Sequence, residues 1–164
     1  MHIPKDLTLK LSRYEEPFRL VHEIMSIEKG RIKCRYDLNA EHPILRVHFP
    51  GNPVMPGVLY IEHIAQAGGI CLYMNHYHPD GSPLTGGYAR DSYIAKTHDF
   101  NFKHMSKPPH SLETEVKVEK LPLANFFLCK GKVFCSGKLA AAGSLTVYFD
   151  VTSPLDKSTW RSVA

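Results

Sequence analysis

The sequence predicts an α+β fold in which one buried helix lies against an antiparallel sheet. The first observation is a segment from about 57 to 75 that is apolar on nearly every helical face, as expected of a helix inside a protein. The second is that segments of alternating apolar and polar residues precede and follow it, joined by short turns. One long helix among consecutive strands is typical of an α+β architecture.

Two strands are expected before the helix. In 17–28, Phe18 and Leu20 alternate with polar neighbours, and the pair Lys29-Gly30 then makes a turn into a second strand over 31–38. Residues 39–47 are expected to form a loop, whereas the polar residues 1–16 are compatible with a short helix or strand.

The helix and the segments after it complete the fold. Gly68 and Gly69 each cost the helix about 1 kcal/mol relative to alanine, which predicts that the helix approaches a sheet closely there. A turn-rich loop over 76–85 is followed by strands, although the division of 87–106 into two strands stays open. The expected strands are 87–96, 98–106, 111–121, 125–135 and 138–150.

Composition limits the domain count and the class of protein. The 164 residues, 43% of them hydrophobic, fit a single domain over 1–164, with a core at about 17–150 and a polar tail over 152–164. The net charge of +4 suggests an acidic partner, but the basic residues are scattered and no nucleic-acid motif occurs, so nucleic acid is not expected.

Location is also predicted from composition. No apolar segment reaches the ~18 residues of a membrane span, and the N-terminus lacks the apolar region of a signal peptide. The four cysteines form no CxxC pair, and Cys71 falls on the buried helix. Free thiols in a reducing compartment, and hence a cytoplasmic protein, are expected.

The most informative stretch is 48–70, HFPGNPVMPGVLYIEHIAQAGGI. Its first half is a loop stiffened by prolines and turned by glycines, and it begins with His48. On the helix that follows, Glu62 and Gln66 are four residues apart and share one face. Burial of a carboxylate costs roughly several kcal/mol of free energy unless the group is protonated or partnered. The position of Glu62 on this apolar helix therefore indicates a functional site. His63 points elsewhere, and surface or interface packing is expected of it.

These residues closely resemble the signature of the 3-hydroxyacyl-[acyl carrier protein] dehydratases of fatty-acid synthesis. That signature has His-Phe-x-Gly, then x-Pro-x-x-Pro-Gly, and then a helix with Glu or Asp followed four residues later by Gln. The matching residues here are His48, Phe49, Gly51, Pro53, Pro56, Gly57, Glu62 and Gln66. The resemblance implies the hotdog fold, a curved antiparallel sheet wrapped around one central helix.

The resemblance implies a role for each of these residues. Dehydration needs a base for the C2 proton, an acid for the departing hydroxyl and a donor to the thioester carbonyl. His48 is expected to be the base and Glu62 the acid, since burial keeps a proton on a carboxyl group. The N–H of Gly57, free at the helix N-terminus, is expected to bind the carbonyl. Gln66 either orients Glu62 or satisfies nearby backbone groups.

The resemblance also implies partners. The substrate would be carried on the phosphopantetheine of an acidic acyl carrier protein, entering past Arg90, Lys96, Lys103 or Lys107, and no other cofactor is expected. Similar proteins form the site at a homodimer interface, with His from one chain and the acid from the other, although spacing leaves one-chain and two-chain arrangements open. Tyr93 aligns roughly with a tyrosine that gates the acyl tunnel, but it could equally be a core aromatic residue.

The sequence departs from the family in places. The family strand Pro-Phe-x-Leu-Val-Asp is matched from Pro17 to Val21, but His22 replaces the aspartate. The loop NPVMPG resembles the dehydratase/isomerase branch, whereas Glu62 is typical of the dehydratase-only branch. Because the acid is part of the chemistry, a trans-2-enoyl product without isomerisation is expected.

Two other classes of protein stay open. A hotdog thioesterase also has a carboxylate on its central helix, but typically lacks a histidine on a Pro/Gly loop. A non-catalytic acyl-binding homologue would lack His48 or Glu62, and both are present. A zinc site at His42, His76 and His78 is not expected, because the spacing is unspecific and no cysteine or carboxylate completes the set.

Overall fold

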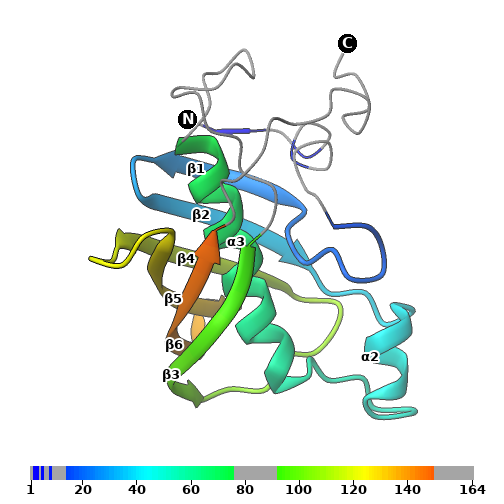
Figure 1. The fold of residues 1–164 in the computed structure, drawn as a ribbon. Helices are drawn as coiled ribbons and strands as arrows, with labels where there is room; N and C mark the ends of the chain where they lie inside the picture. The colour runs from blue at the N-terminus through cyan, green and yellow to red at the C-terminus, as the bar shows by residue number, and fades with distance from the viewer. Residues whose placement is uncertain (1, 4, 6–7, 9–13, 76–91, 150–164) are drawn as a thin grey trace.

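In a computed structural model, residues 2, 3, 5, 8, 14–75 and 92–149 are described, and they form one antiparallel sheet with a long helix against it (Figure 1). The strands are ordered β1-β2-β4-β5-β6-β3 across the sheet. Their bounds are β1 Glu23–Glu28, β2 Arg31–Asp37, β3 Ser92–Phe102, β4 Ser111–Lys120, β5 Phe126–Cys135 and β6 Lys138–Phe149, with helices α2 Pro43–Val47 and α3 Gly57–Asn75. The α+β prediction is confirmed.

The core lies between α3 and the concave face of the sheet. Figure 1 shows the strands curving around α3, which packs mainly on β4, β5 and β6. Strand residues alternate between buried and exposed, as the two-residue period of a strand requires. The inward set on β4 is Leu112, Thr114 and Val116, and its exposed neighbours are Glu113, Glu115 and Lys117.

Close approach of α3 to the sheet depends on glycine, as predicted. A Cβ on Gly68 would lie 2.6 Å from Sγ of Cys129, and one on Gly69 would lie 2.8 Å from Oγ of Ser92. From the sheet side, a Cβ on Gly131 would lie 2.5 Å from Cδ1 of Ile64. At each of the three positions a side chain of the facing element packs where a Cβ would otherwise lie, so helix and sheet come closer than any larger residue would allow.

Several predicted boundaries were wrong. The first strand begins at Glu23, because residues 17–22 form a turn and an irregular segment instead. Part of the predicted loop 39–47 is the short helix α2. The single strand β3 replaces the two strands predicted over 87–106, and it bulges against β6 between Ile94 and Lys96 and again between His98 and Asn101. The loop 76–85 and the tail 152–164 lie outside the described residues.

The two ends of the sheet differ. At the β1 end, Ile3 donates its N–H to the carbonyl of Ile24, and the N–H of Ile24 is bound by the hydroxyl of Thr8. At the other end β3 pairs with β6 alone, and Tyr93 and Ile94 remain 55% and 41% exposed. Ile24 on β1 is therefore bonded on its outer side, whereas no strand of the described residues pairs with the outer edge of β3 (the open β3 edge).

All four cysteines are buried and free of disulfide bonds. Burial raises the pKa of the Cys34 and Cys129 thiols to about 12, so both are protonated and unreactive at neutral pH. Among the described residues, no helix is long and apolar enough to cross a membrane.

Candidate active site

The loop that carries His48 follows α2 and is held by its own backbone. Val54 donates its N–H to the carbonyl of His48 at 2.8 Å, while Phe49 and Asn52 exchange two backbone hydrogen bonds across the turn. Nδ1 of His48 lies 3.0 Å from the carbonyl oxygen of Val54. Because a carbonyl only accepts, Nδ1 donates in this contact, and in the neutral imidazole Nε2 is then the nitrogen with the lone pair.

The carboxyl group of Glu62 is held by a residue on the next turn of α3, Gln66. The amide nitrogen of Gln66 donates to Oε1 of Glu62 at 2.9 Å and to the carbonyl of Phe18 at 2.8 Å, and its oxygen accepts from the N–H of Leu20 at 2.8 Å. The prediction left two roles open for Gln66, and its buried amide has both. Among the described residues, Oε2 of Glu62 has no hydrogen-bond partner.

Gly57 is the first residue of α3, so its N–H has no acceptor within the helix. A Cβ on this glycine would lie 3.6 Å from the ring of Phe102, an ordinary contact distance. The amide is thus placed at the rim of an apolar surface, at the positive end of the helix dipole.

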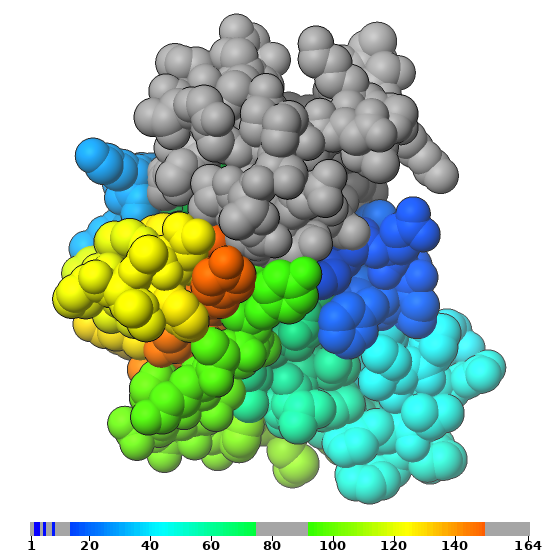
Figure 2. All heavy atoms as spheres, viewed as in Figure 1, coloured from blue at the N-terminus to red at the C-terminus, as the bar shows by residue number. Residues whose placement is uncertain are grey.

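The catalytic candidates lie on two separate elements. Figure 2 shows α2, in cyan, projecting at one corner of the molecule beside the beginning of α3. Within one chain, and among the described residues, no hydrogen bond joins the side chains of His48 and Glu62. Large apolar side chains near them are exposed: Phe49 57%, Val58 69%, Phe102 53% and Met105 69%.

Other predicted site residues are only partly placed. Tyr93 lies on the open β3 edge, so a core role within one chain is wrong. Lys96, Lys103 and Lys107 are exposed, and Nζ of Lys107 donates to Oδ1 of Asn52 at 2.7 Å. Arg90 lies outside the described residues.

Of the three histidines considered as zinc ligands, only His42 lies among the described residues. His42 caps α2, accepting from the N–H of Ile44 at Nδ1 while Nε2 contacts the carbonyl of Pro17. Both of its ring nitrogens are therefore occupied, and His76 and His78 lie outside the described residues. Where the family strand has aspartate, Nδ1 of His22 accepts the N–H of Asp37.

The prediction for His63 was wrong. The side chain is fully buried against the sheet, with Nε2 3.6 Å from Sγ of Cys34 and its ring edge-on to Tyr36. Burial lowers the pKa of His63 to about 3, and Nδ1 has no partner. His63 is three residues after Tyr60 and three before Gln66, and all three side chains lie on the buried side of α3.

Sequence reasoning also missed the segment that holds the catalytic loop. Ser106, in the connection between β3 and β4, is fully buried and binds both the backbone N–H of Met55 and the hydroxyl of Tyr60. The signal in the sequence was the hydroxyl group of Tyr60, which lies on an otherwise apolar face of the helix and indicates a buried hydrogen-bond partner.

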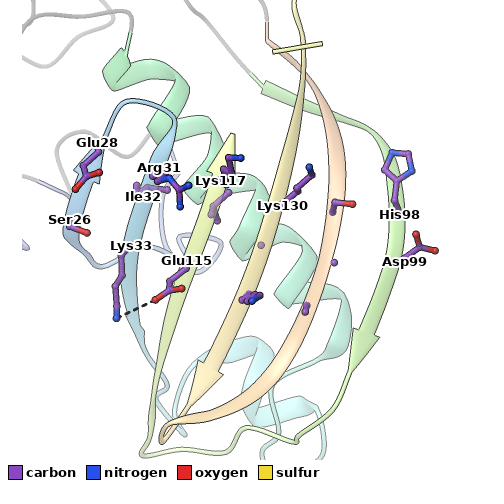
Figure 3. A pocket seen from close by; sticks show the side chains of 16 residues that line it. Ser26, Glu28, Arg31, Ile32, Lys33, His98, Asp99, Glu115, Lys117 and Lys130 are labelled. Atoms are coloured by element: carbon purple, nitrogen blue, oxygen red, sulfur yellow. Dashed lines mark ion pairs between the residues drawn. The ribbon is translucent and has the colours of Figure 1, made fainter. Parts of the chain in front are cut away.

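The described surface also has a hollow of about 650 Å³, and it lies away from these residues. Figure 3 shows it in front of the sheet, with α3 behind. Ion pairs cross this face: Lys33 with Glu115, and both Lys117 and Lys130 with Glu119. Hydrogen bonds from those two lysines lower the pKa of Glu119 to about 2. Charged side chains paired in this way are typical of a sheet face that is exposed to solvent.

Comparison with known proteins gives one consistent result. The sequence model of the FabA-like domain matches residues 14–144. The chain is 34% identical over 130 residues to the 3-hydroxyacyl-[acyl-carrier-protein] dehydratase FabZ of Thermomicrobium roseum, covering 79% of this chain and 80% of the relative. It is 32% identical over 150 residues to that of Klebsiella pneumoniae, covering 88% and 93%.

A solved structure agrees on the fold. The dehydratase heterocomplex ApeI:P from Xenorhabdus doucetiae superposes with a TM-score of 0.72 at 16% identity, over 92% of this chain and 93% of that one. At this identity the likeness concerns the hotdog fold alone.

Proposed function

The chain belongs to the FabA-like family, and from that premise we propose that it dehydrates (3R)-3-hydroxyacyl-acyl carrier protein to the trans-2-enoyl product. The observation that carries this proposal is the tautomer of His48. With Nδ1–H bound to the carbonyl of Val54, Nε2 is a base aimed by a rigid loop.

Each group then has one step. Nε2 of His48 takes the C2 proton, and the electrons of the broken C–H bond move toward the thioester carbonyl, whose oxygen is bound by the N–H of Gly57. The C2=C3 bond forms as the C3–O bond breaks, and Glu62 gives its proton to the leaving hydroxyl, which departs as water. The proton on His48 is returned to Glu62 before the next turnover. No cofactor besides the phosphopantetheine arm enters this scheme.

The test is mass spectrometry of carrier-bound products from 3-hydroxyacyl substrates of several chain lengths. A loss of one water with the thioester intact supports dehydration. Release of free carrier thiol without an enoyl product would instead establish a thioesterase, and tight binding without any product an acyl-binding protein.

The open β3 edge supports a homodimer as the working unit. Among the described residues β3 pairs with β6 alone, and Ile94 and Phe102 on it are exposed apolar side chains, an arrangement that proteins normally pair or cover. Antiparallel pairing of two β3 strands would join both sheets and bring the exposed Phe49 and Val58 of one chain toward the other. His48 of one chain would then meet Glu62 of its partner, and Tyr93 would lie at the joint beside the acyl chain.

Mixing two inactive variants tests the shared site. If His48→Ala and Glu62→Gln chains exchange, half of the dimers are mixed and each has one complete site, so about a quarter of wild-type turnover returns. A site within one chain would give no recovery, and sedimentation of wild type as an active monomer would exclude the dimer.

The acyl carrier partner is supported by charge. Lys96, Lys103 and Lys107 are exposed on or after β3, and the whole chain has a net charge of +4. Raising salt from 50 to 300 mM should raise KM for the carrier-bound substrate and leave KM for an N-acetylcysteamine thioester unchanged. The buried free thiols fit a cytoplasmic setting.

A further inference from the structure

The start of α3 lacks the usual side-chain cap. Pro56 precedes Gly57, so no Ser, Thr, Asp or Asn side chain is available there to bind the first helical amides. The first turn also contains no acidic residue. Gly57 itself has no side chain through which packing could set the direction of its N–H. Its orientation therefore depends on how the chain is held on either side.

Ser106 binds the chain on both sides of Gly57. Two residues before Gly57, the N–H of Met55 donates to the carbonyl of Ser106 at 2.9 Å. Three residues after Gly57, the hydroxyl of Tyr60 donates to Oγ of Ser106 at 2.7 Å. Tyr60 is 2% exposed and Ser106 0%, so water does not compete for either bond.

Ser106 is in turn attached to the sheet. The N–H groups of Lys103 and His104 both donate to the carbonyl of Ala140 on β6. The ring of Phe102 lies 6.2 Å from that of Tyr60, centroid to centroid, and covers Gly57. The connection between β3 and β4 thus links the rigid sheet to both flanks of one helix N-terminus.

We infer that Tyr60 and Ser106 are positioning residues that aim the N–H of Gly57 at the thioester carbonyl in the transition state. The inference rests on the proposed function, because it assigns the direction of the donor used there. Burial raises the pKa of Tyr60, so its hydroxyl stays protonated and donates throughout the working range. A donor misdirected by loss of this bond stabilises the developing oxyanion less.

Tyr60→Phe and Ser106→Ala test this. Complete loss of an oxyanion donor costs about 10²–10³ in kcat, so a misaimed donor should cost about 10-fold in kcat, with KM and the pH profile of kcat unchanged. Because both residues act through one bond, the double variant should be no slower than the slower single variant. Tyr36→Phe, which removes another buried tyrosine hydroxyl, is the matched control and should keep wild-type kcat.

A spectroscopic measurement distinguishes a misdirected N–H of Gly57 from a general loss of rigidity in the site. In a Glu62→Gln background, which stops turnover, the infrared carbonyl stretch of bound crotonyl-N-acetylcysteamine should shift less to low frequency after Tyr60→Phe than before it. Unchanged kcat and unchanged carbonyl frequency in Tyr60→Phe would overturn the inference, as would a shifted pH profile. If Tyr60→Phe does not fold, Ser106→Ala decides by the same criteria. An inactive wild type would overturn the proposed function instead.

Discussion

The side-chain amide of Gln66 joins the carboxyl group of Glu62 to the backbone of a distant segment. Its nitrogen lies 2.9 Å from Oε1 of Glu62, and its other contacts are the N–H of Leu20 and the carbonyl of Phe18, both before β1. Since the N–H must meet an oxygen and the carbonyl must meet a nitrogen, the amide has one orientation. The amide that directs Glu62 is therefore oriented by backbone groups that lie 46 and 48 residues before Gln66 in the chain.

Gln66→Met should weaken both stability and turnover. The change keeps the volume but leaves the N–H of the fully buried Leu20 without its acceptor, which costs about 1–3 kcal/mol of unfolding free energy. Turnover should fall about 10-fold, because Glu62 loses the bond that directs it. Urea unfolding and steady-state rates measure the two effects, and a variant as stable and as fast as wild type would contradict both.

His48→Ala and Glu62→Gln should each reduce turnover at least ~10²-fold with the fold intact, since each removes one proton-transfer partner. Far-UV circular dichroism checks the fold. His110→Ala and Glu41→Gln are controls, because they change an exposed histidine and an exposed carboxylate elsewhere and should keep wild-type rates. Near-normal turnover in a folded His48 or Glu62 variant would refute the assignment.

The product should be the trans-2-enoyl isomer alone. Isomerisation to cis-3 needs the substrate to bend so that C4 reaches the same base, and Glu62 is one methylene longer than aspartate, which narrows that space. The measurement is separation of the isomers after incubation with a ten-carbon 3-hydroxyacyl carrier. A substantial cis-3 fraction would show that the NPVMPG loop, and not the acid, accompanies isomerase activity.

Acid should destabilise the protein through His63. Its pKa is about 3 in the folded chain, against the ordinary value of 6.5, so the unfolded chain binds a proton that the folded chain excludes over that interval. As pH falls from 6.5 toward 3, unfolding free energy should decrease by up to about 1.4 kcal/mol per pH unit from this group. Above pH 6.5 it contributes no slope.

His63→Gln separates this contribution from that of its neighbours. His22, whose pKa burial also lowers, packs on Tyr36 as well and keeps its own share of the slope. The expected result is a shallower dependence of urea midpoint on pH between 4 and 6.5 in the variant. Parallel curves for variant and wild type would exclude His63 as the source.

The central helix was predicted well from the sequence because the residues that determine its position lie in the helix itself and directly before it. Apolar residues on all faces and the Pro-Gly loop before Gly57 determine where α3 begins, and the structure has it from Gly57 to Asn75. The pairing of Glu62 with Gln66 was also predictable, since four residues make one helical turn.

What sequence could not provide depends on contacts between distant residues. β3 continues as one strand through Thr97, which pairs with Leu145, and its two bulges on either side exist only against β6. The links from Gln66 to Leu20 and from Tyr60 to Ser106 span 46 residues each and follow no local period. His63 was misplaced for the same reason, because only the sheet shows which side of a uniformly apolar helix faces inward.

The bridge from Ile3 to Ile24 bears on how far assembly can proceed. Strand addition is a polymerisation whenever each unit offers two growing ends, and here the backbone groups of Ile24 at one end are already bonded by Ile3 and Thr8. An antiparallel contact between two β3 strands uses the same edge of both chains, so it is satisfied by two copies and cannot by itself extend into a filament. Further strand addition would have to occur at β1, where Ile3 and Thr8 already bond the outer side of Ile24.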